Sequence, residues 1–297
     1  MRVVGIDIGF GQVKVVAKDV QFKFPSQIAQ YLHDELSEVE WVFHDGERYV
    51  VGEFADVFKH KISVSSVDLL IRYAGVFVRY VLNRLGEGSW IVVSGLPPRF
   101  KSYSSLLESS IREVPQVREV LIVPQGVGVL EDTREVLMGY EDAIILDVGF
   151  NTVDYLAVRR QGGKFIKEKS GTVEGLGVKS AVEVFRSMLP SQAGYYRNEP
   201  LVFLVPYLLK GSLSVAGQEL DLTDVKERSL NIWTQQLYSR VMEEVGDLLS
   251  RRSLVVVAGG GAYFISKKVF DREVFVPNLP EFSNARGYYK IGVQQML

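Results

Sequence analysis

The sequence predicts an α/β protein built from two related domains, and three observations support this prediction. The chain has 297 residues, 47% of them hydrophobic, which exceeds the usual size of one compact domain. Stretches with strand and helix patterns alternate along it. A segment near the N-terminus also recurs in mid-chain, offset by 140 residues from Asp7 to Asp147.

The recurring segment is a predicted β-hairpin. VVGIDI and VKVVA flank the turn GFGQ, and AIILDV and VDYLAV flank the turn GFNT. The aligned pairs are Asp7 with Asp147, Gly9 with Gly149, Phe10 with Phe150 and Val13 with Val153. So long a period indicates a duplicated domain rather than a solenoid, whose repeats are shorter.

The remaining elements follow from apolar periodicity and turn residues. Strands are expected at WIVVSGLP and LVVVAGGGAYFI, and EVLIVPQGVGVL should run from a strand into a helix. Residues 42–51 predict a hairpin that turns at Asp45 and Gly46, and residues 131–140 a polar helix or loop. Helices are predicted over residues 64–85, 103–114, 175–189 and 224–249, with a short one at the C-terminus.

Composition excludes several classes of function. The formal net charge is -2, from 34 basic and 36 acidic residues, so direct nucleic-acid binding is not expected. Without cysteine, the chain has neither disulfides nor thiolate metal sites. No signal peptide or apolar run of membrane-spanning length is present, so we expect a cytoplasmic protein without a membrane segment.

The two glycine turns predict phosphate binding. A tight turn presents successive backbone N–H groups, and glycine lets an anion approach them closely. Asp7 and Asp147, at the ends of the preceding strands, would repel an anion unless a divalent cation lies between, so they are candidate Mg²⁺ ligands. Lys14 either adds a positive charge near the phosphates or is an exposed strand lysine.

A third glycine cluster, Gly259, Gly260 and Gly261, follows a buried strand and precedes a predicted helix. It either lets a purine or ribose approach the backbone or forms only a turn between strand and helix. No GK[ST] follows any glycine run, and the other glycines lie in hairpins, so Walker A and dinucleotide-binding loops are disfavoured.

Four segments in this order, IDIGFGQVK, VPQGVGVL, LDVGFNTVD and VVAGGGA, resemble the phosphate-1, connect-1, phosphate-2 and adenosine motifs of the actin, sugar-kinase and heat-shock chaperone superfamily. DGERYVVGEFA, VSGLPPRF, GVKSAVEVF and PEFSNARGYYKIG resemble bacterial and archaeal actin-like ATPases of the ParM type. The resemblance implies an actin-like (ribonuclease H-like) two-lobed fold, with duplicated mixed-sheet domains flanked by helices and a nucleotide cleft between them. The expected domains are residues 1–142 with 283–297, and residues 143–282.

The resemblance also implies the site residues. The catalytic group is Gln125, Asp147 and Asp154, and the metal ligands are Asp7 and Asp147. The nucleotide-binding group is Asp7, Gly9, Phe10, Gly11, Gln12, Lys14, Gly149, Phe150, Asn151, Thr152, Glu174, Gly175, Lys226, Gly259, Gly260 and Gly261.

Several of these residues have two interpretations. Gln125 orients the attacking water or only begins a helix after Pro124, and as a neutral amide it would support slow hydrolysis. Asp154 either organises water or braces the second turn, the role we favour. Lys226 flanks the base or is a solvated helix charge, as Arg228 would be. Phe10 and Phe150 stand where the family commonly has small or hydroxylated residues, which leaves phosphate recognition to the backbone.

We expect an ATPase that binds ATP with Mg²⁺, with GTP as the alternative nucleotide, and forms filaments. Its partners would be copies of itself and a DNA-binding adaptor, in plasmid or DNA segregation or intracellular positioning. The alternatives on the same fold are a small-molecule (sugar-type) kinase and a chaperone-like or monomeric regulatory ATPase. The chain shows no sugar-binding signature, and we expect no substrate-binding domain after the nucleotide core.

Overall fold

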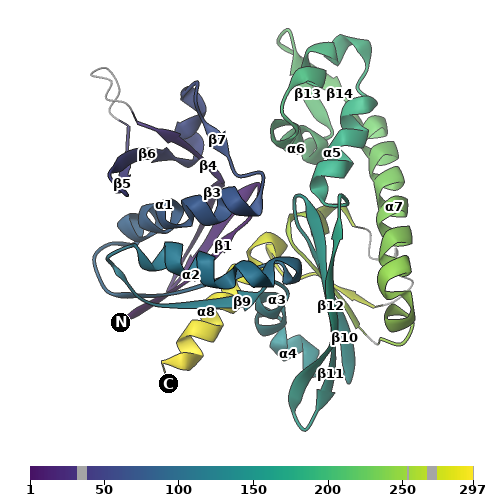
Figure 1. Cartoon of the computed structure of the whole chain (residues 1–297). Coiled ribbons are helices and arrows are strands. Elements are labelled where there is room, and N and C mark those ends of the chain that lie inside the picture. Colours follow the sequence, from purple (N-terminus) through teal and green to yellow (C-terminus); the bar gives the residue numbers. More distant parts are fainter. Residues whose placement is uncertain (32–38, 253, 266–272, 297) are drawn as a thin grey trace. The chain divides into compact units, whose positions relative to one another are not determined.

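The computed structural model describes residues 1–31, 39–252, 254–265 and 273–296. Its contacts divide the chain into two compact units (Figure 1). Unit 1 comprises Met1–Val136 and Glu281–Leu297, and unit 2 comprises Leu137–Pro280. Each unit has its own five-stranded sheet and its own hydrophobic core.

The main sheet of unit 1 has the order β3-β2-β1-β8-β9. β1 pairs antiparallel with β2, and β2 with β3, whereas β1, β8 and β9 run parallel. The strands are β1 (Arg2–Ile8), β2 (Gln12–Ala17), β3 (Val20–Pro25), β8 (Trp90–Leu96) and β9 (Val117–Pro124). The helices of the unit are α1 (Val67–Leu85), α2 (Ser104–Arg112), α3 (Val127–Asp132), α4 (Arg134–Leu137), which ends in unit 2, and α8 (Ser283–Gln295).

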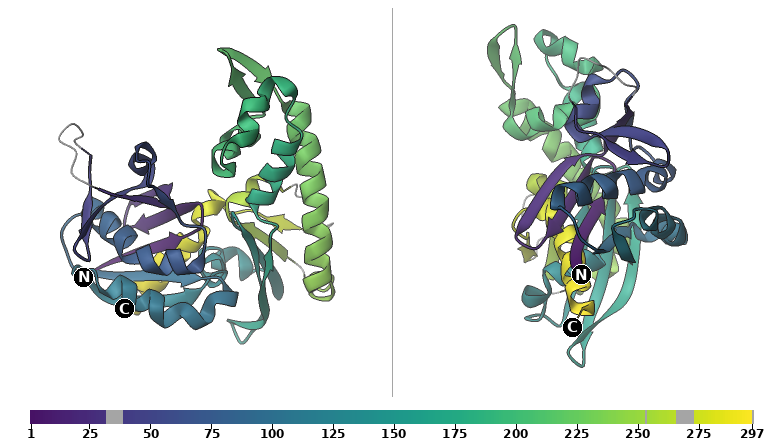
Figure 2. Two further views of the ribbon diagram at one scale, coloured as in Figure 1. Left: turned by 45° about the horizontal axis from the view of Figure 1, so that its top comes forward. Right: turned by 90° about the vertical axis from the view of Figure 1, so that its left-hand side faces the viewer.

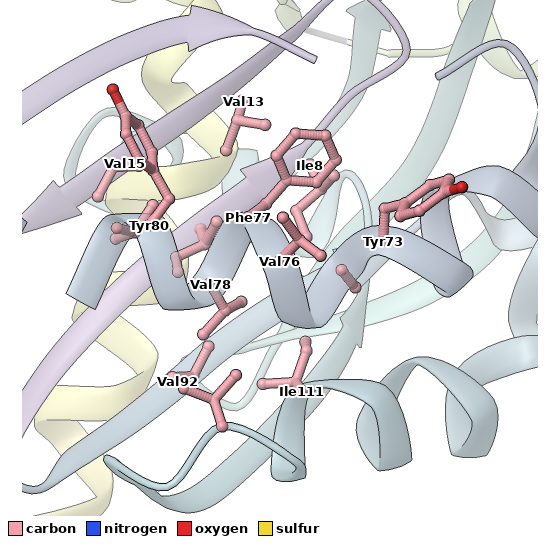
Figure 3. Close-up of a cluster of buried hydrophobic side chains, with 14 of the residues drawn as sticks. Ile8, Val13, Val15, Tyr73, Val76, Phe77, Val78, Tyr80, Val92 and Ile111 are labelled. Atoms are coloured by element: carbon pink, nitrogen blue, oxygen red, sulfur yellow. The ribbon is translucent and has the colours of Figure 1, made fainter. Parts of the chain in front are cut away.

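Both faces of this sheet are covered, because side chains of a strand alternate between its two faces. Val4, Ile6 and Ile8 of β1 belong to the cluster that contains the apolar side of α1 and Ile111 of α2 (Figure 3). The opposite face packs against α8, and a Cβ added to Gly5 would lie 2.1 Å from the Ala285 carbonyl oxygen. Glycine is therefore required where α8 crosses β1.

A smaller sheet of unit 1 has the order β5-β6-β4-β7. Its β5–β6 hairpin confirms the turn predicted at Asp45 and Gly46, both of which have positive φ, 49° and 78°. The strands are β4 (Gln27–Gln30), β5 (Val42–His44), β6 (Glu47–Val51) and β7 (Ile62–Ser63). Short 3-10 helices follow at η1 (Gly52–Val57), η2 (Pro98–Tyr103) and η5 (Pro280–Phe282), the last spanning the border of the units.

The main sheet of unit 2 has the order β12-β11-β10-β15-β16. Its strands are β10 (Asp142–Val148), β11 (Thr152–Gln161), β12 (Lys164–Glu174), β15 (Leu254–Ala258) and β16 (Val274–Phe275). Ile144, Leu146 and Val148 pack against α5 (Val178–Ser187) and the 27-residue helix α7 (Thr223–Leu249), which Figure 2 shows beside the sheet.

The two main sheets confirm the duplication. In each, three strands consecutive in sequence form an antiparallel meander, and the first of them pairs on its other side with a later parallel strand, which in turn pairs with another parallel strand. β10 therefore corresponds to β1, and β11 to β2. The register is the same at the turns, since Asp7 faces Lys14 and Asp147 faces Asp154.

A segment of unit 2 for which the sequence analysis predicted no element forms a small separate layer. It comprises η3 (Ser191–Asn198), α6 (Leu201–Lys210), and the hairpin of β13 (Ser212–Val215) and β14 (Gln218–Asp221). Leu204 and Leu208 of α6 join the core cluster of the unit.

The predicted helices are present, with ends set by local chemistry. Residues 64–85 were predicted helical, and α1 begins only at Val67 because the Ser66 hydroxyl accepts a hydrogen bond from the Leu69 amide at 3.3 Å. No helix of the described residues is long and apolar enough to cross a membrane.

A buried arginine connects the edge of the unit 2 sheet to its interior. Arg252, which follows α7, has a side chain only 1% exposed and forms ion pairs with Glu168 and, at 3.5 Å, with Asp142. Glu168 is the extra residue of a β-bulge, because Ala157 pairs with Lys169 and Val158 with Lys167. The bulge thus places this carboxylate against Arg252.

The glycines after β15 pack on β10. Gly259 has φ +79° and ψ 170°, and an added Cβ would lie 2.4 Å from the Val148 carbonyl oxygen and 2.5 Å from Asp147 Oδ1. The helix expected next is a short 3-10 helix in the described residues, η4 (Gly260–Phe264), which begins within the glycines. Glycine at 259 therefore lets β15 end beside Asp147.

Glu168→Gln should lower the free energy of unfolding by about 2 kcal/mol, because it removes a charged partner from a buried guanidinium. Urea denaturation measures the change. The control Glu183→Gln alters an exposed residue of α5 and should leave the midpoint unchanged. Equal midpoints for the two variants would contradict the structural role of the Arg252–Glu168 pair.

Gly259→Ala should lower the free energy of unfolding by about 2 kcal/mol, because a side chain there is strained in φ and collides with β10. Thermal melting without ligand tests this. Gly260→Ala is a matched control one residue away, since an added Cβ there meets nothing within 4 Å. If both substitutions lower the melting temperature equally, the close approach at Gly259 is not the cause.

Candidate functional site

The first hairpin closes its turn with a hydrogen bond from the Gly9 amide to the Gln12 carbonyl at 3.1 Å. Asp7 lies at the end of β1 and is only 5% exposed. Both of its carboxylate oxygens have partners: Lys14 Nζ lies 3.3 Å from Oδ2, and Gln125 Nε2 donates to Oδ1 at 3.1 Å. The structure thus brings together three of the predicted residues, two of them 118 positions apart.

Lys14 lies beside the first turn rather than on an exposed surface. Its side chain is 17% exposed, and Nζ lies 2.9 Å from the position of a Cβ added to Gly9. Gln125 lies between β9 and α3, and its backbone amide donates to the Leu96 carbonyl at 2.8 Å. The Gln125 amide oxygen is then the side-chain atom that could accept a hydrogen bond from water.

The second hairpin repeats the closing bond, from the Gly149 amide to the Thr152 carbonyl at 2.9 Å. Helix α5 begins against this turn: the Val178 and Lys179 amides donate to the carbonyls of Gly149 and Phe150, at 3.0 and 2.8 Å. The approach is close, because a Cβ added to Gly177 would lie 2.4 Å from the Phe150 carbonyl oxygen.

Two buried carboxylates face one another across the second hairpin. Asp147 is 7% exposed and Asp154 is 3% exposed. Asp154 accepts a hydrogen bond from the Thr172 hydroxyl of β12, the kind of contact that a bracing role requires. Like charges directly opposite one another are unfavourable in a sheet unless hydrogen-bond donors or a positive charge compensate them.

Most of the remaining predicted residues lie beside the second hairpin, whereas Lys226 lies at the end of α6. Ala258 pairs with Asp147, so Gly259, Gly260 and Gly261 lie next to the second hairpin. Gly175 is held there too, since its amide donates to the Asn151 carbonyl at 3.2 Å, and Glu174 faces Thr152. Lys226 instead donates to the Leu209 carbonyl at 2.6 Å, at the end of α6. No hydrogen bond or ion pair among the described residues connects Lys226 to either turn.

The phenylalanines at equivalent positions of the two turns are packing residues. Phe10 packs against the core of unit 1 and Phe150 against the core of unit 2. Each ring thus anchors its turn. The backbone atoms of the turn remain as the groups that can meet a ligand.

These backbone atoms fit an anion. Within the described part of the chain, the amides of Phe10, Gly11, Phe150 and Asn151 donate no hydrogen bond. Adjacent unpaired N–H groups form an anion-binding concavity. Each hairpin adds a buried aspartate, and no group of three or more His, Asp or Glu side chains suited to a metal occurs among the described residues. Mg²⁺ fits such a sparse donor set, because it retains waters and binds phosphate oxygens.

Two residues that contact the turns were missed by the sequence analysis. Ser26 is 2% exposed, and its hydroxyl donates to the Gly9 carbonyl at 2.5 Å. Gly177 makes the close approach to Phe150 described above. Ser26 follows Pro25 at the end of a strand, and no sequence pattern distinguishes it. Gly177 immediately precedes α5, where a glycine is also expected simply as the residue before a helix.

Comparison with known families gives two matches. A model described as "Actin like proteins N terminal domain" matches residues 5–128, and one described as "Archaeal actin homologue MreB-like, C-terminal" matches residues 145–271. Comparison with curated proteins gives no match.

Several solved structures have the same fold. A 15-stranded ParM filament from Clostridium botulinum is 20% identical, with a TM-score of 0.77 and 99% of both chains covered. An archaeal actin homologue in complex with ADP is 17% identical, with a TM-score of 0.76, 99% of this chain and 100% of that chain covered. A MamK double helical filament is 18% identical, with a TM-score of 0.68 and 98% of both chains covered.

These structures establish the predicted actin-like fold. The two family models match successive parts of the sequence, the first including the turn that follows Asp7 and the second including the turn that follows Asp147. The chain belongs to the family of actin-like proteins.

Proposed function

We propose that this protein is an ATPase that binds ATP with Mg²⁺ through its two hairpins and polymerises into filaments. The observation that carries the proposal is the pair of equivalent turns, each with unpaired amides and a buried aspartate. A similar protein has been solved in complex with ADP, and others as filaments.

The residues have distinct roles in this proposal. The amides of both turns bind phosphate oxygens, and Lys14 adds positive charge beside the first turn. Asp7 and Asp147 are the Mg²⁺ ligands, and the bound cation would neutralise phosphate charge near these carboxylates. Gly175 and Gly259, Gly260 and Gly261 allow the nucleoside to approach the backbone of unit 2. The proposal also includes the two domains expected from the sequence, residues 1–142 with 283–297 and residues 143–282.

Gln125 is the proposed water-orienting residue. Its amide nitrogen is held by Asp7, which leaves the oxygen to accept a hydrogen bond from water. An amide is not a strong base, so hydrolysis should be slow. Asp154 braces the second turn through Thr172. Slow hydrolysis suits a protein whose output is the lifetime of a polymer, in DNA or plasmid segregation through an adaptor, or in intracellular positioning.

Asp147→Ala should reduce Mg²⁺-dependent ATP hydrolysis at least tenfold, because it removes a metal ligand. Gln125→Ala should bind ATP normally and turn over more slowly. Phosphate release and nucleotide titration measure both variants, with Asp247→Ala, an exposed change in α7, as the control. Unchanged hydrolysis in the first two variants would remove the site assignment. Hydrolysis that requires a sugar would favour the kinase alternative.

Helix α6 offers a surface for self-association. Its sequence, LVFLVPYLLK, is apolar at nine of ten positions, yet Val202, Phe203 and Leu209 are 39%, 38% and 44% exposed. A helix that is apolar all round is usually covered. We propose that a second copy of the chain covers this helix in the filament.

The double variant V202K/L209K should therefore fail to sediment with ATP and Mg²⁺ at concentrations at which the unmodified protein does. Its melting temperature and ATP affinity should be unchanged, because both side chains are exposed. Normal sedimentation of this variant would exclude α6 as the contact. Failure of the unmodified protein to sediment or scatter light at any concentration would reject filament formation itself.

A further inference from the structure

Ser26 lies between β3 and β4, and all three of its polar groups have partners. Its hydroxyl donates to the Gly9 carbonyl at 2.5 Å, and its amide donates to the Gly11 carbonyl at 3.1 Å. Its own carbonyl accepts a hydrogen bond from the Val64 amide at 2.9 Å. The residue is 2% exposed, so these contacts are shielded from water.

These contacts determine the direction of amides in the first turn. In a planar trans peptide, the carbonyl of one residue and the N–H of the next point in opposite directions. Fixing the Gly9 carbonyl therefore fixes the Phe10 N–H, and fixing the Gly11 carbonyl fixes the Gln12 N–H. Glycine offers little resistance to rotation of these peptide groups, so the restraint has to come from outside the turn.

The second turn is restrained in the same sense by different groups. Its three carbonyls, of Gly149, Phe150 and Asn151, accept hydrogen bonds from backbone amides of the segment that begins α5, those of Val178, Lys179 and Gly175. No side chain is needed there. In the first turn, the only restraint on the Gly9 carbonyl among the described residues is the hydroxyl of Ser26.

We infer that Ser26 is a positioning residue for phosphate binding, a role that rests on the proposed function. Its hydroxyl keeps the Gly9–Phe10 peptide oriented with the N–H available to the anion. Without the hydroxyl, the peptide can rotate and present a carbonyl oxygen, which repels phosphate. The side chain need not touch the nucleotide.

Ser26→Ala should weaken the binding of ADP with Mg²⁺ about tenfold, as measured by calorimetric titration. Adenosine is the second probe. It has no phosphates, so its affinity should be unchanged. Ser26→Cys has a side chain of nearly the same size but with a weaker donor, so its ADP affinity should lie between those of the unmodified protein and Ser26→Ala. It also provides a second variant if Ser26→Ala folds poorly.

Ser94→Ala is the matched control. Ser94 is also fully buried, and its hydroxyl donates to the Ile6 carbonyl of β1 at 2.7 Å, away from the turn. Removal of the Ser94 hydroxyl should lower the melting temperature about as much as Ser26→Ala does, and it should change ADP affinity less than twofold. Equal weakening of ADP binding in both serine variants, or none in Ser26→Ala and Ser26→Cys, would overturn the inference.

The same titration separates this inference from the proposed function. If the unmodified protein binds ADP and Asp147→Ala does not, while Ser26→Ala binds normally, only the role of Ser26 fails. If the unmodified protein does not bind ADP with Mg²⁺, the nucleotide site is wrong and the role of Ser26 fails with it. A loss of adenosine binding in Ser26→Ala would indicate a general structural defect and would also overturn it.

Discussion

The orientation of two short stretches of backbone is the constraint on which the proposed phosphate site depends. A hydrogen bond to the carbonyl of a peptide group helps to keep the N–H of that group directed to the opposite side, where a ligand can meet it. Ser26 satisfies two carbonyls in the first turn, and the segment that begins α5 satisfies three in the second. The strands, the core and the helix starts all contribute by keeping these turns in place.

The phenylalanines of the turns illustrate how the fold and the site share residues. Phe10 and Phe150 each pack against the core of their own unit, so hydrophobic burial keeps the turn in place. A serine or threonine at the same position would offer a hydroxyl to a phosphate but would lose this packing. Phosphate binding at the proposed site would therefore depend on backbone donors, which do not require a particular side chain.

Much of the fold could be predicted from the sequence, because its signals are local. The hairpins follow from alternating apolar residues around glycine turns, and the repeat of Asp7 at Asp147 anticipated two sheets with the same strand order. The contact of Gln125 with Asp7 spans 118 residues and depends on where β9 and β1, which flank β8 in the sheet, end relative to one another, which no local pattern encodes. The layer around α6 was missed because its apolar residues have no clear periodic face.

The register of the two hairpins has a further consequence for how the duplicated halves diverged. Lys14 and Asp154 occupy equivalent positions, opposite Asp7 and Asp147, but carry opposite charges. The first hairpin can neutralise its aspartate internally, whereas the second has an acidic pair. Two identical chains in a symmetric dimer would have the same residue at both positions. Joining the halves in one polypeptide lets one position carry a lysine and the equivalent position of the other half carry an aspartate.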